Sequence, residues 1–358
     1  METKTAVPSI NEEKLQAFLG QVIGDFGAAL SCALVYIGQK LGLYKAMAGA
    51  GPLSSAELAT RTSTTERYVR EWLLNQAAGG YVEYDPKSGR YTLPPEHAVA
   101  LTDETSPCYV GGGFYVIKAM TQAQSRIAEA FRQGGGMLWG EHDPDLFIGT
   151  ERFFRPGYAA HLVSEWIPAL TGVEAKLKSG GVVADIGCGH GASTVIMAKT
   201  YPKSRFFGFD NHEPSIQHAR RTAAEASVAD RVTFEVSDAS RFQDHRYDLI
   251  AFFDCLHDMG DPVAAAKRAG ETLGPAGSVM VVEPMAGQTV EENFNPIGRT
   301  FSAASTLCCT ANSLALKGPA LGAVASDEAI RKTLAAGGFT QFRRATQTPF
   351  NRIFEARR

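Results

Sequence analysis

The chain has 358 residues, enough for two domains with substantial hydrophobic cores. Apolar residues make up 44% of the sequence and charged residues 20%, an ordinary balance for a globular protein. The net charge of −3 argues against general binding of polyanions. The six cysteines are scattered without a C-x-x-C spacing, so a disulfide framework is excluded and a reduced, cytoplasmic protein is expected.

The N-terminus shows no sign of a targeting segment. It lacks the basic region and apolar core of a signal peptide. The longest apolar run, residues 28–37, falls short of the ~18 residues that a membrane span needs. We therefore expect no membrane partner.

Residues 11 to about 48 are helical by period. Apolar side chains recur at the spacing of one helix face, at Leu15, Phe18, Leu19, Val22, Ile23 and Phe26. Such an apolar surface near the start of a chain is buried either in the core of its own domain or in an interface with another subunit. We favour the interface and expect a homodimer.

A helix, turn, helix and hairpin pattern follows. Two capping boxes, Ser54 to Glu57 and Ser63 to Glu66, predict two short helices. Residues 81–93 predict a hairpin around a turn-rich tip. Residues 1–100 are therefore expected to form a mainly α winged-helix domain.

Winged helices often bind DNA, so the charge of this region matters. Residues 1–100 hold nine Lys and Arg against ten Asp and Glu. Phosphate contacts supply most of the affinity of DNA-binding proteins, and this balance provides few of them. We favour a dimerisation module, with DNA binding unlikely, although Arg61, Arg67 and Arg70 leave that alternative open.

Residues 101–178 are expected to form a helical connecting region. The glycine runs 111–113 and 134–136 predict two flexible joints around a helical segment. The acids and histidine of residues 139–145 favour a polar turn over a metal site, because no second pair of ligands follows at a recognisable spacing. The aromatic residues of 153–166 predict a helix that runs into the next domain.

From residue 179 to 358 the pattern becomes a regular alternation of strand and helix. Near-continuous apolar strands separated by helical stretches indicate an α/β fold with a parallel sheet covered on both faces. The predicted strands cover residues 182–186, 205–210, 231–236, 247–253, 277–283, 339–344 and 350–356.

The first of these strands ends on an acid and opens into three alternating glycines. Gly187, Gly189 and Gly191 allow the backbone to lie against a flat ligand at the carboxyl end of a parallel strand. The loop also satisfies the loose dinucleotide pattern G-x-G-x-x-G/A, which is weak by itself. Asp185 would repel a pyrophosphate but attract an ammonium and a sulfonium, which points to S-adenosylmethionine.

Further acids follow the next strands. Asp210 ends the second strand at the distance from the glycine loop expected for a carboxylate that binds ribose hydroxyls. Asp238 follows the third strand, where it could accept a hydrogen bond from an adenine amino group. The predicted cofactor-binding residues are Asp185, Gly187, Gly189, Gly191, Asp210, Asn211, Asp238, Ala239, Phe253 and Asp254.

Residues 180–285 resemble a class I S-adenosylmethionine-dependent methyltransferase domain. The whole architecture is similar to winged-helix small-molecule O-methyltransferases of the plant caffeate type and their bacterial relatives. The resemblance implies a Rossmann-like sheet of seven strands with a final antiparallel strand, a place that residues 349–354 fit. It also implies S-adenosylhomocysteine as a product and an acceptor pocket lined by residues 294–322.

The segment after the fourth strand carries the predicted chemistry. His257 lies there, and its ordinary pKa of ~6.5 suits a base that removes a hydroxyl proton. The resemblance implies this role for His257 and an orienting role for Glu283. Met259 replaces the family's tryptophan, and the second orienting glutamate has no counterpart around residues 317–320.

Three alternatives remain open at this stage. The acceptor is most simply a small molecule with a hydroxyl, but a thiol, with an ordinary pKa of ~8.5, needs little help from a base, and an amine is also compatible. A different class of function is a cofactor-sensing, DNA-binding regulator without turnover. No metal is predicted, because the adjacent Cys308 and Cys309 lack partner ligands and are expected to be buried as small apolar residues.

Overall fold

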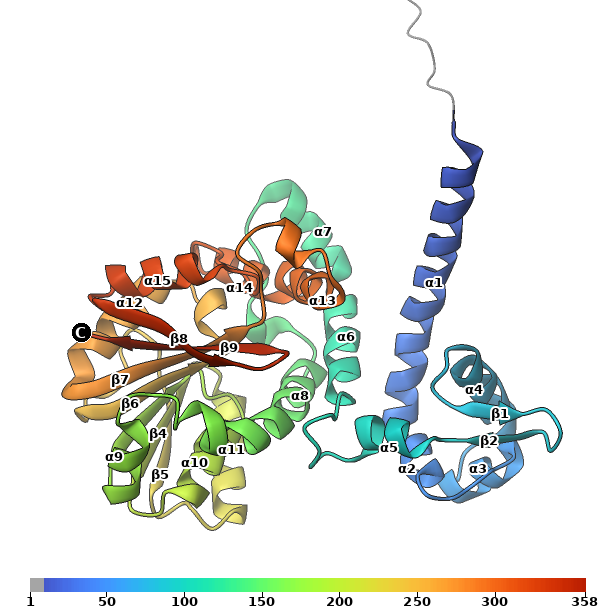
Figure 1. The fold of residues 1–358 in the computed structure, drawn as a ribbon, viewed down its shortest axis with the longest axis horizontal. Helices are drawn as coiled ribbons and strands as arrows, with labels where there is room; N and C mark the ends of the chain where they lie inside the picture. Colours follow the sequence, from blue (N-terminus) through green and yellow to red (C-terminus); the bar gives the residue numbers. More distant parts are fainter. Residues whose placement is uncertain (1–9) are drawn as a thin grey trace, which may run out of the picture. The chain divides into compact units, whose positions relative to one another are not determined.

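The structure is a computed structural model that describes residues 10–358 (Figure 1). It divides into two compact units, Met1–Asp103 and Glu104–Arg358. The predicted connecting region, residues 101–178, falls within the second unit from Glu104 onward. Its status as a separate domain stays a prediction.

The first unit has the predicted winged-helix elements. Strands β1 and β2 pair antiparallel and form the wing. The mainly α winged-helix prediction is therefore confirmed. The elements are α1 (Glu12–Lys40), α2 (Leu43–Met47), α3 (Ser55–Thr62), α4 (Glu66–Ala78), β1 (Glu83–Asp85), β2 (Arg90–Thr92) and α5 (Pro95–Thr102).

One of the two predicted capping boxes forms. Ser54 caps α3: its hydroxyl accepts from the Glu57 backbone N–H, and its own N–H donates to the Glu57 carboxylate at 2.8 Å. The second box is wrong, because Ser63 adopts a left-handed φ of 52° at the end of α3 and Thr65 precedes α4 without a side-chain cap. The Glu66 carboxylate instead accepts a hydrogen bond from Ser55.

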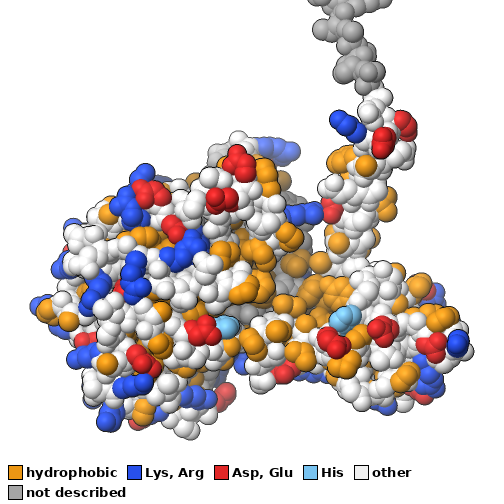
Figure 2. Space-filling view, in the orientation of Figure 1, with side chains coloured by type: hydrophobic (Ala, Val, Ile, Leu, Met, Phe, Trp, Pro, Cys, Tyr) orange, Lys and Arg blue, Asp and Glu red, His pale blue; other side chains and the backbone are white. Residues whose placement is uncertain are grey.

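Helix α1 exposes much of its apolar face. Phe18, Ile23, Phe26 and Leu30 are each between 59% and 70% exposed, and Figure 2 shows hydrophobic side chains along the helix. Within residues 10–358, α1 is also the one helix long and apolar enough to cross a membrane by length and composition, and only 6% of its apolar window is buried. The apolar run in the sequence underestimated this length because Gly24, Asp25 and Gly27 interrupt the apolar residues before position 28.

The second unit begins with helices. Residues 101–178 are helical, as predicted. The elements are α6 (Gly112–Gln122), α7 (Gln124–Gln133), the 3₁₀ turn η1 (Trp139–Glu141), α8 (Asp145–His161), the π-helical turn η2 (Leu162–Trp166) and α9 (Val173–Ser179).

A seven-stranded sheet follows, in the order β5-β4-β3-β6-β7-β9-β8. The first five strands of this order are parallel, whereas β9 runs antiparallel to both β7 and β8. The Rossmann-like prediction, including the antiparallel strand, is confirmed. The strands are β3 (Val182–Ile186), β4 (Arg205–Asp210), β5 (Val232–Val236), β6 (Tyr247–Phe253), β7 (Leu273–Pro284), β8 (Gln341–Gln347) and β9 (Asn351–Arg357).

Helices cover both faces of the sheet (Figure 1). One core packs against α9, α10 and α11, and the other against α12 and α15. The strand order reverses between β3 and β6, and the carboxyl ends of strands at such a switch point form the usual ligand crevice. The remaining elements are α10 (Ala192–Thr200), α11 (Glu213–Glu225), η3 (Leu256–Asp258), α12 (Pro262–Thr272), η4 (Glu291–Asn293), α13 (Pro296–Ala304), the π-helical turn η5 (Ser305–Cys309), α14 (Thr310–Ala315) and α15 (Asp327–Ala336).

Glycines allow α6 and α8 to cross closely. A Cβ on Gly112 would lie 2.5 Å from the Phe153 backbone nitrogen, and one on Gly149 would lie 2.7 Å from the Val116 nitrogen. The prediction of a flexible joint at residues 111–113 is therefore wrong, because Gly112 and Gly113 belong to α6 and pack against α8. In the second run, Gly134 and Gly135 have left-handed φ values and form a turn after α7.

The Gly112→Ala variant should destabilise the protein by about 1–3 kcal/mol, because its methyl group has no space between the two helices. Gly157→Ala is the matched control on α8, where a Cβ would meet nothing within 4 Å. That control should be neutral or more stable by about 0.5–1 kcal/mol, as expected for alanine inside a helix. Denaturant unfolding measures both variants, and equal stability of the two would contradict the close crossing.

Candidate active site

The glycine loop joins β3 to α10. Gly187, Gly189 and Gly191 have left-handed φ values of 72°, 51° and 79°. Gly187 and Gly191 are confined, since an added Cβ would lie 2.8 Å from the Cys255 sulfur or 2.6 Å from the Phe234 ring. A Cβ on Gly189 would meet nothing within 4 Å, so this glycine borders open space that a ligand can enter.

Asp210, at the end of β4, holds the glycine loop. Its Oδ2 accepts from the Gly189 N–H at 2.9 Å, and its Oδ1 accepts from the His212 N–H at 2.9 Å. Burial raises the pKa of this carboxyl, and the two N–H donors partly oppose that rise. Each oxygen retains a second lone pair for a further donor.

Asp185 is fully buried at the end of β3. Its Oδ2 accepts from the Ser193 and Thr194 hydroxyls, each at 2.6 Å. Its Oδ1 is buried without a hydrogen-bond partner. Burial raises the pKa of Asp185 to about 6 despite the two hydroxyl donors.

Asp254 follows β6 in a left-handed conformation, with φ of 51°. It accepts from the Tyr158 hydroxyl and from the Asn351 amide, each at 2.8 Å. Burial raises its pKa to about 7. The preceding Phe253 is 7% exposed, and its ring centroid lies 5.2 Å from that of Tyr158.

The other predicted cofactor residues lie nearer the surface. Asn211 and Asp238 are exposed, and Ala239 is half-buried. The Asp238 carboxylate accepts from the Ser240 backbone N–H at 2.7 Å, which shapes the loop after β5. These three residues follow the ends of β4 and β5.

His257 and Glu283 form a buried pair. The His257 Nδ1 and the Glu283 Oε2 are 2.6 Å apart, and the two side chains are 3% and 0% exposed. Burial lowers the pKa of His257, but the Glu283 carboxylate and Cys309 raise it, and the net pKa lies well above its ordinary value. The Glu283 Oε1 is buried without a hydrogen-bond partner.

Two segments distant in sequence close around the His257 turn. The Trp139 indole, from η1, donates to the Asp258 carboxylate at 2.5 Å. The Asn312 amide donates to the Asp258 carbonyl at 2.9 Å. Cys309 is buried, as predicted, and its sulfur lies within 4.8 Å of a His257 ring nitrogen, a contact that its sequence context did not predict.

Helix α8 makes three contacts with the strand ends that the sequence did not predict, two of them through residues, Phe147 and Glu151, that were not among the candidates. The Phe147 ring stacks on His212 after β4, the Glu151 carboxylate lies 2.9 Å from His190 in the glycine loop, and Tyr158 binds Asp254 after β6. The spacings of four and seven residues place all three on one face of the helix. That period was the one available signal in the sequence.

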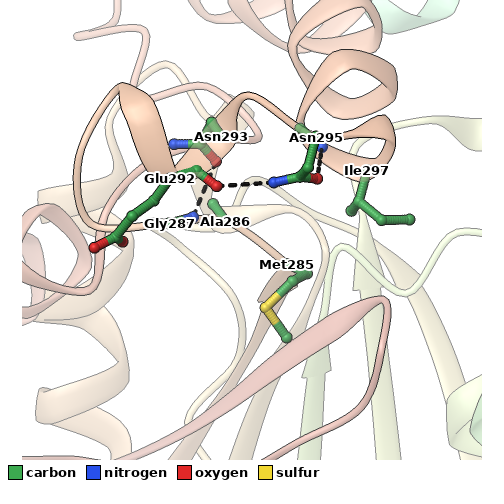
Figure 3. Close-up of a pocket in the computed structure, with 8 residues that line it drawn as sticks. Met285, Ala286, Gly287, Glu292, Asn293, Asn295 and Ile297 are labelled. Atoms are coloured by element: carbon green, nitrogen blue, oxygen red, sulfur yellow. Dashed lines mark hydrogen bonds between the residues drawn. The ribbon is translucent and has the colours of Figure 1, made fainter.

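A small open pocket lies just beyond β7. Met285 and Ile297 provide apolar walls, and Glu292 and Asn295 lie on the polar side (Figure 3). Asn295 caps α13 through the Gly298 N–H at 2.9 Å, and its amide donates to the Glu292 carbonyl. The pocket begins two residues after Glu283 and extends to Gly298, within the segment 294–322 that is predicted to line an acceptor site.

The carboxyl edge of the sheet is rich in acids that are buried (Asp185, Asp258) or half-buried (Asp210, Asp254). Asp185, Asp210, Asp254 and Asp258 all have raised pKa values, in each case first because of burial. The hydrogen bonds to these side chains come from hydroxyl, amide and indole donors. A ligand that carries positive charge would therefore be stabilised here.

Each of the two units contains a region that matches a protein-family model. Residues 28–103 match the model of the Rv2258c-like winged HTH domain, and residues 177–338 match that of a methyltransferase domain. The chain carries a winged helix-turn-helix domain and a methyltransferase domain. The acid-rich edge at the switch point lies within the methyltransferase domain.

Individual relatives agree with this assignment. The chain is 29% identical over 131 residues to the 27-O-demethylrifamycin SV methyltransferase of Amycolatopsis mediterranei. The match covers 34% of this chain and 48% of that protein, so the chain spans about half the length of this curated relative. A mitomycin 7-O-methyltransferase structure is similar over 97% of this chain and 100% of that one, with TM-score 0.74 and 16% identity. Human N-acetylserotonin methyltransferase, in complex with S-adenosylmethionine, is similar over 100% and 99%, with TM-score 0.66 and 18% identity. At these identities the two structures show a shared fold.

The raised pKa of Asp254 predicts how stability depends on pH in the cofactor-free protein. Its folded-state pKa of about 7 lies above the ordinary value of 3.8, so its favourable contribution is complete at low pH and is lost as pH rises through about 7. Between about pH 5 and about pH 8, wild type should lose on the order of 2–3 kcal/mol more unfolding free energy than Asp254→Asn. Denaturant unfolding at both pH values measures the difference.

Asp230→Asn, at an exposed aspartate paired with Arg231, is the control and should follow wild type. An Asp254→Asn variant with the wild-type pH dependence would show that this carboxyl does not titrate in that window.

Proposed function

We propose that this protein transfers a methyl group from S-adenosylmethionine to a hydroxyl of a small molecule, with His257 as the base. The buried His257–Glu283 pair beside the acid-rich edge is the observation that carries the proposal. The methyltransferase-domain match supports the reaction class. The O-methyltransferase names of the relatives described above favour oxygen as the acceptor atom.

The residues at the sheet edge fit this cofactor. S-adenosylmethionine supplies an electrophilic methyl group on a sulfonium and also carries an ammonium. Asp185 has a buried carboxylate oxygen without a hydrogen-bond partner, and the Asp210 carboxylate is near enough to raise its pKa, which suits the ammonium and the sulfonium of the cofactor. Gly189 leaves open space beside the loop. In this proposal Asp210 binds the ribose hydroxyls through its remaining lone pairs, and Asp238 and Ala239 lie at the adenine.

His257 has the arrangement of an oriented base. Glu283 engages Nδ1, so Nε2 is the atom that we propose takes the acceptor proton. The Glu283 carboxylate raises the pKa of His257 against the effect of burial, which favours the protonated imidazole in the free protein. A cationic cofactor nearby would lower that pKa by like-charge repulsion, which favours the neutral base when the cofactor is bound. Turnover is then expected to rise with pH.

In this proposal the acceptor binds next to the His257 turn. Residues 294–322 bring Cys309 and Asn312 against it, and the pocket at Met285 and Ile297 opens beside this segment. The mixture of apolar walls and amide groups suits a small, partly apolar hydroxyl compound. A screen of phenols, thiols and amines for methylated product tests the choice of oxygen.

The winged helix is assigned to dimerisation in this proposal. Arg67 pairs with Glu71, Arg70 with Glu66, and Arg90 with Glu57. Arginines that are paired with glutamates of the same domain make poor phosphate contacts, which counts against a DNA-binding regulator. The six cysteines are free, in keeping with the reduced cytoplasm that we propose as the compartment.

Replacing the base tests the proposed reaction. His257→Ala should lower kcat by about 10²- to 10⁴-fold, the usual contribution of a general base. Cofactor affinity should change little, because the proposed cofactor contacts lie on Asp185 and Asp210. Glu283→Gln should give a smaller loss, and its kcat should rise at lower pH than in wild type because the carboxylate no longer raises the His257 pKa. Steady-state kinetics across pH measures these effects.

His245→Ala is the matched control, since His245 precedes β6 at the opposite edge of the sheet. Its kcat should equal that of wild type. Near-normal turnover of His257→Ala with intact cofactor binding would overturn the histidine base and favour a thiol acceptor.

The exposed face of α1 should form a homodimer interface. Light scattering at micromolar concentration should give the mass of a dimer, and Phe18→Asp combined with Phe26→Asp should give a monomer because charges then face the apolar partner surface. Phe131→Asp, at a 75% exposed site on α7, is the control that should stay dimeric. A monomeric wild type that binds lipid vesicles through α1 would instead favour a membrane as the partner.

A further inference from the structure

We propose that Glu151, His190 and His218 form a binding site for a divalent transition-metal ion of the Zn²⁺ type. The three side chains come from α8, the glycine loop and α11, and their ligand atoms lie within 4.8 Å of one another. Two imidazoles and one carboxylate are a donor set that suits Zn²⁺ and its first-row neighbours. This site is separate from the His257 turn.

The distances match what one ion would require. The Glu151 Oε2 lies 2.9 Å from the His190 Nδ1 and 3.6 Å from the His218 Nε2. Two ligands bound at about 2.1 Å to a tetrahedral Zn²⁺ are about 3.4 Å apart. The two imidazole rings stack with centroids 4.0 Å apart, which keeps both nitrogens beside the same oxygen. Small side-chain adjustments therefore convert the present contacts into coordination.

The charge states also suit metal binding. Burial raises the pKa of Glu151, but His190, His218 and Arg155 together lower it by more, so the net pKa lies below its ordinary value. The carboxylate is therefore ionised at neutral pH. Burial and the neighbouring His190 lower the pKa of His218. Arg155 lies 3.7 Å from the other Glu151 oxygen, Oε1, and leaves Oε2 for the ion.

The site is accessible from one side. The side chains of His190 and Glu151 are 9% and 20% exposed, whereas His218 is 40% exposed. A hydrated ion can reach the ligands past His218, and water can complete its coordination. The ion would fasten α8 and α11 to the loop that contains Gly189 and Gly191, and it would stabilise the folded state by binding it in preference to the unfolded chain.

Titration of Zn²⁺ into the untagged full chain tests the site independently of methyl transfer. Calorimetry should show one Zn²⁺ bound per chain, and a thermal melt should show stabilisation. His218→Ala and Glu151→Gln should each weaken binding at least about tenfold, since even indirect partners of metal ligands contribute that much. Co²⁺ should give a visible absorption band with wild type that His218→Ala lacks. Circular dichroism checks that each variant is folded.

Two further variants serve as controls. His161→Ala removes the histidine of a His161–Glu165 pair that has no second imidazole, and it should retain wild-type Zn²⁺ affinity. Residues 10–358 contain one other cluster of possible metal ligands, His257, Asp258 and Cys309. Cys309→Ser removes one ligand of that cluster and should also retain wild-type Zn²⁺ affinity. Absence of saturable binding to wild type, unchanged affinity in His218→Ala, or loss of binding in Cys309→Ser would overturn the proposal.

Discussion

The burial of carboxylates at one edge of the sheet is the constraint on which the site depends. Removing a carboxylate from water disfavours its charged form, and Asp185, Asp254 and Asp258 show the result in pKa values raised to about 6 or 7. Polar donors from distant segments make this burial tolerable. Hydroxyls at the start of α10, the Tyr158 phenol, the Trp139 indole and the Asn351 amide each serve one of these acids. Without a ligand, the buried carboxylates at this edge reduce the stability of the folded protein. With a ligand, they favour one that carries positive charge.

Helix α8 is the element that links the separate strand ends. Through Phe147, Glu151 and Tyr158 it reaches the loops after β4, β3 and β6 in turn. Its position depends on the close crossing with α6, which Gly112 and Gly149 allow. The packing of two helices thus determines how the cofactor loop and the Asp254 turn are held together. Glycines that look like joints in the sequence are in fact part of this rigid arrangement.

Much of the fold could be predicted because its signals are local. Apolar strands ending in acids, alternating with helices, indicate the parallel sheet, and the resemblance supplied the antiparallel strand and the His257–Glu283 pairing. Long-range contacts carried no such signal: nothing in the sequence connects Trp139 to Asp258, or Glu151 to His190 and His218. The second capping box failed because Ser63 was needed for a left-handed turn. The burial of Asp185 was also unforeseen, since the pattern gives the position of a residue on a strand but not its depth.

The position of β9 has a consequence for synthesis of the chain. This strand follows all other strands of the sheet in sequence, yet it lies between β7 and β8. On the ribosome, β7 therefore emerges with an open edge, and β8 has no partner until β9 arrives. Such an edge invites pairing with other chains. We expect nascent chains halted before Asn351 to depend on chaperones, and they also lack the amide that binds Asp254.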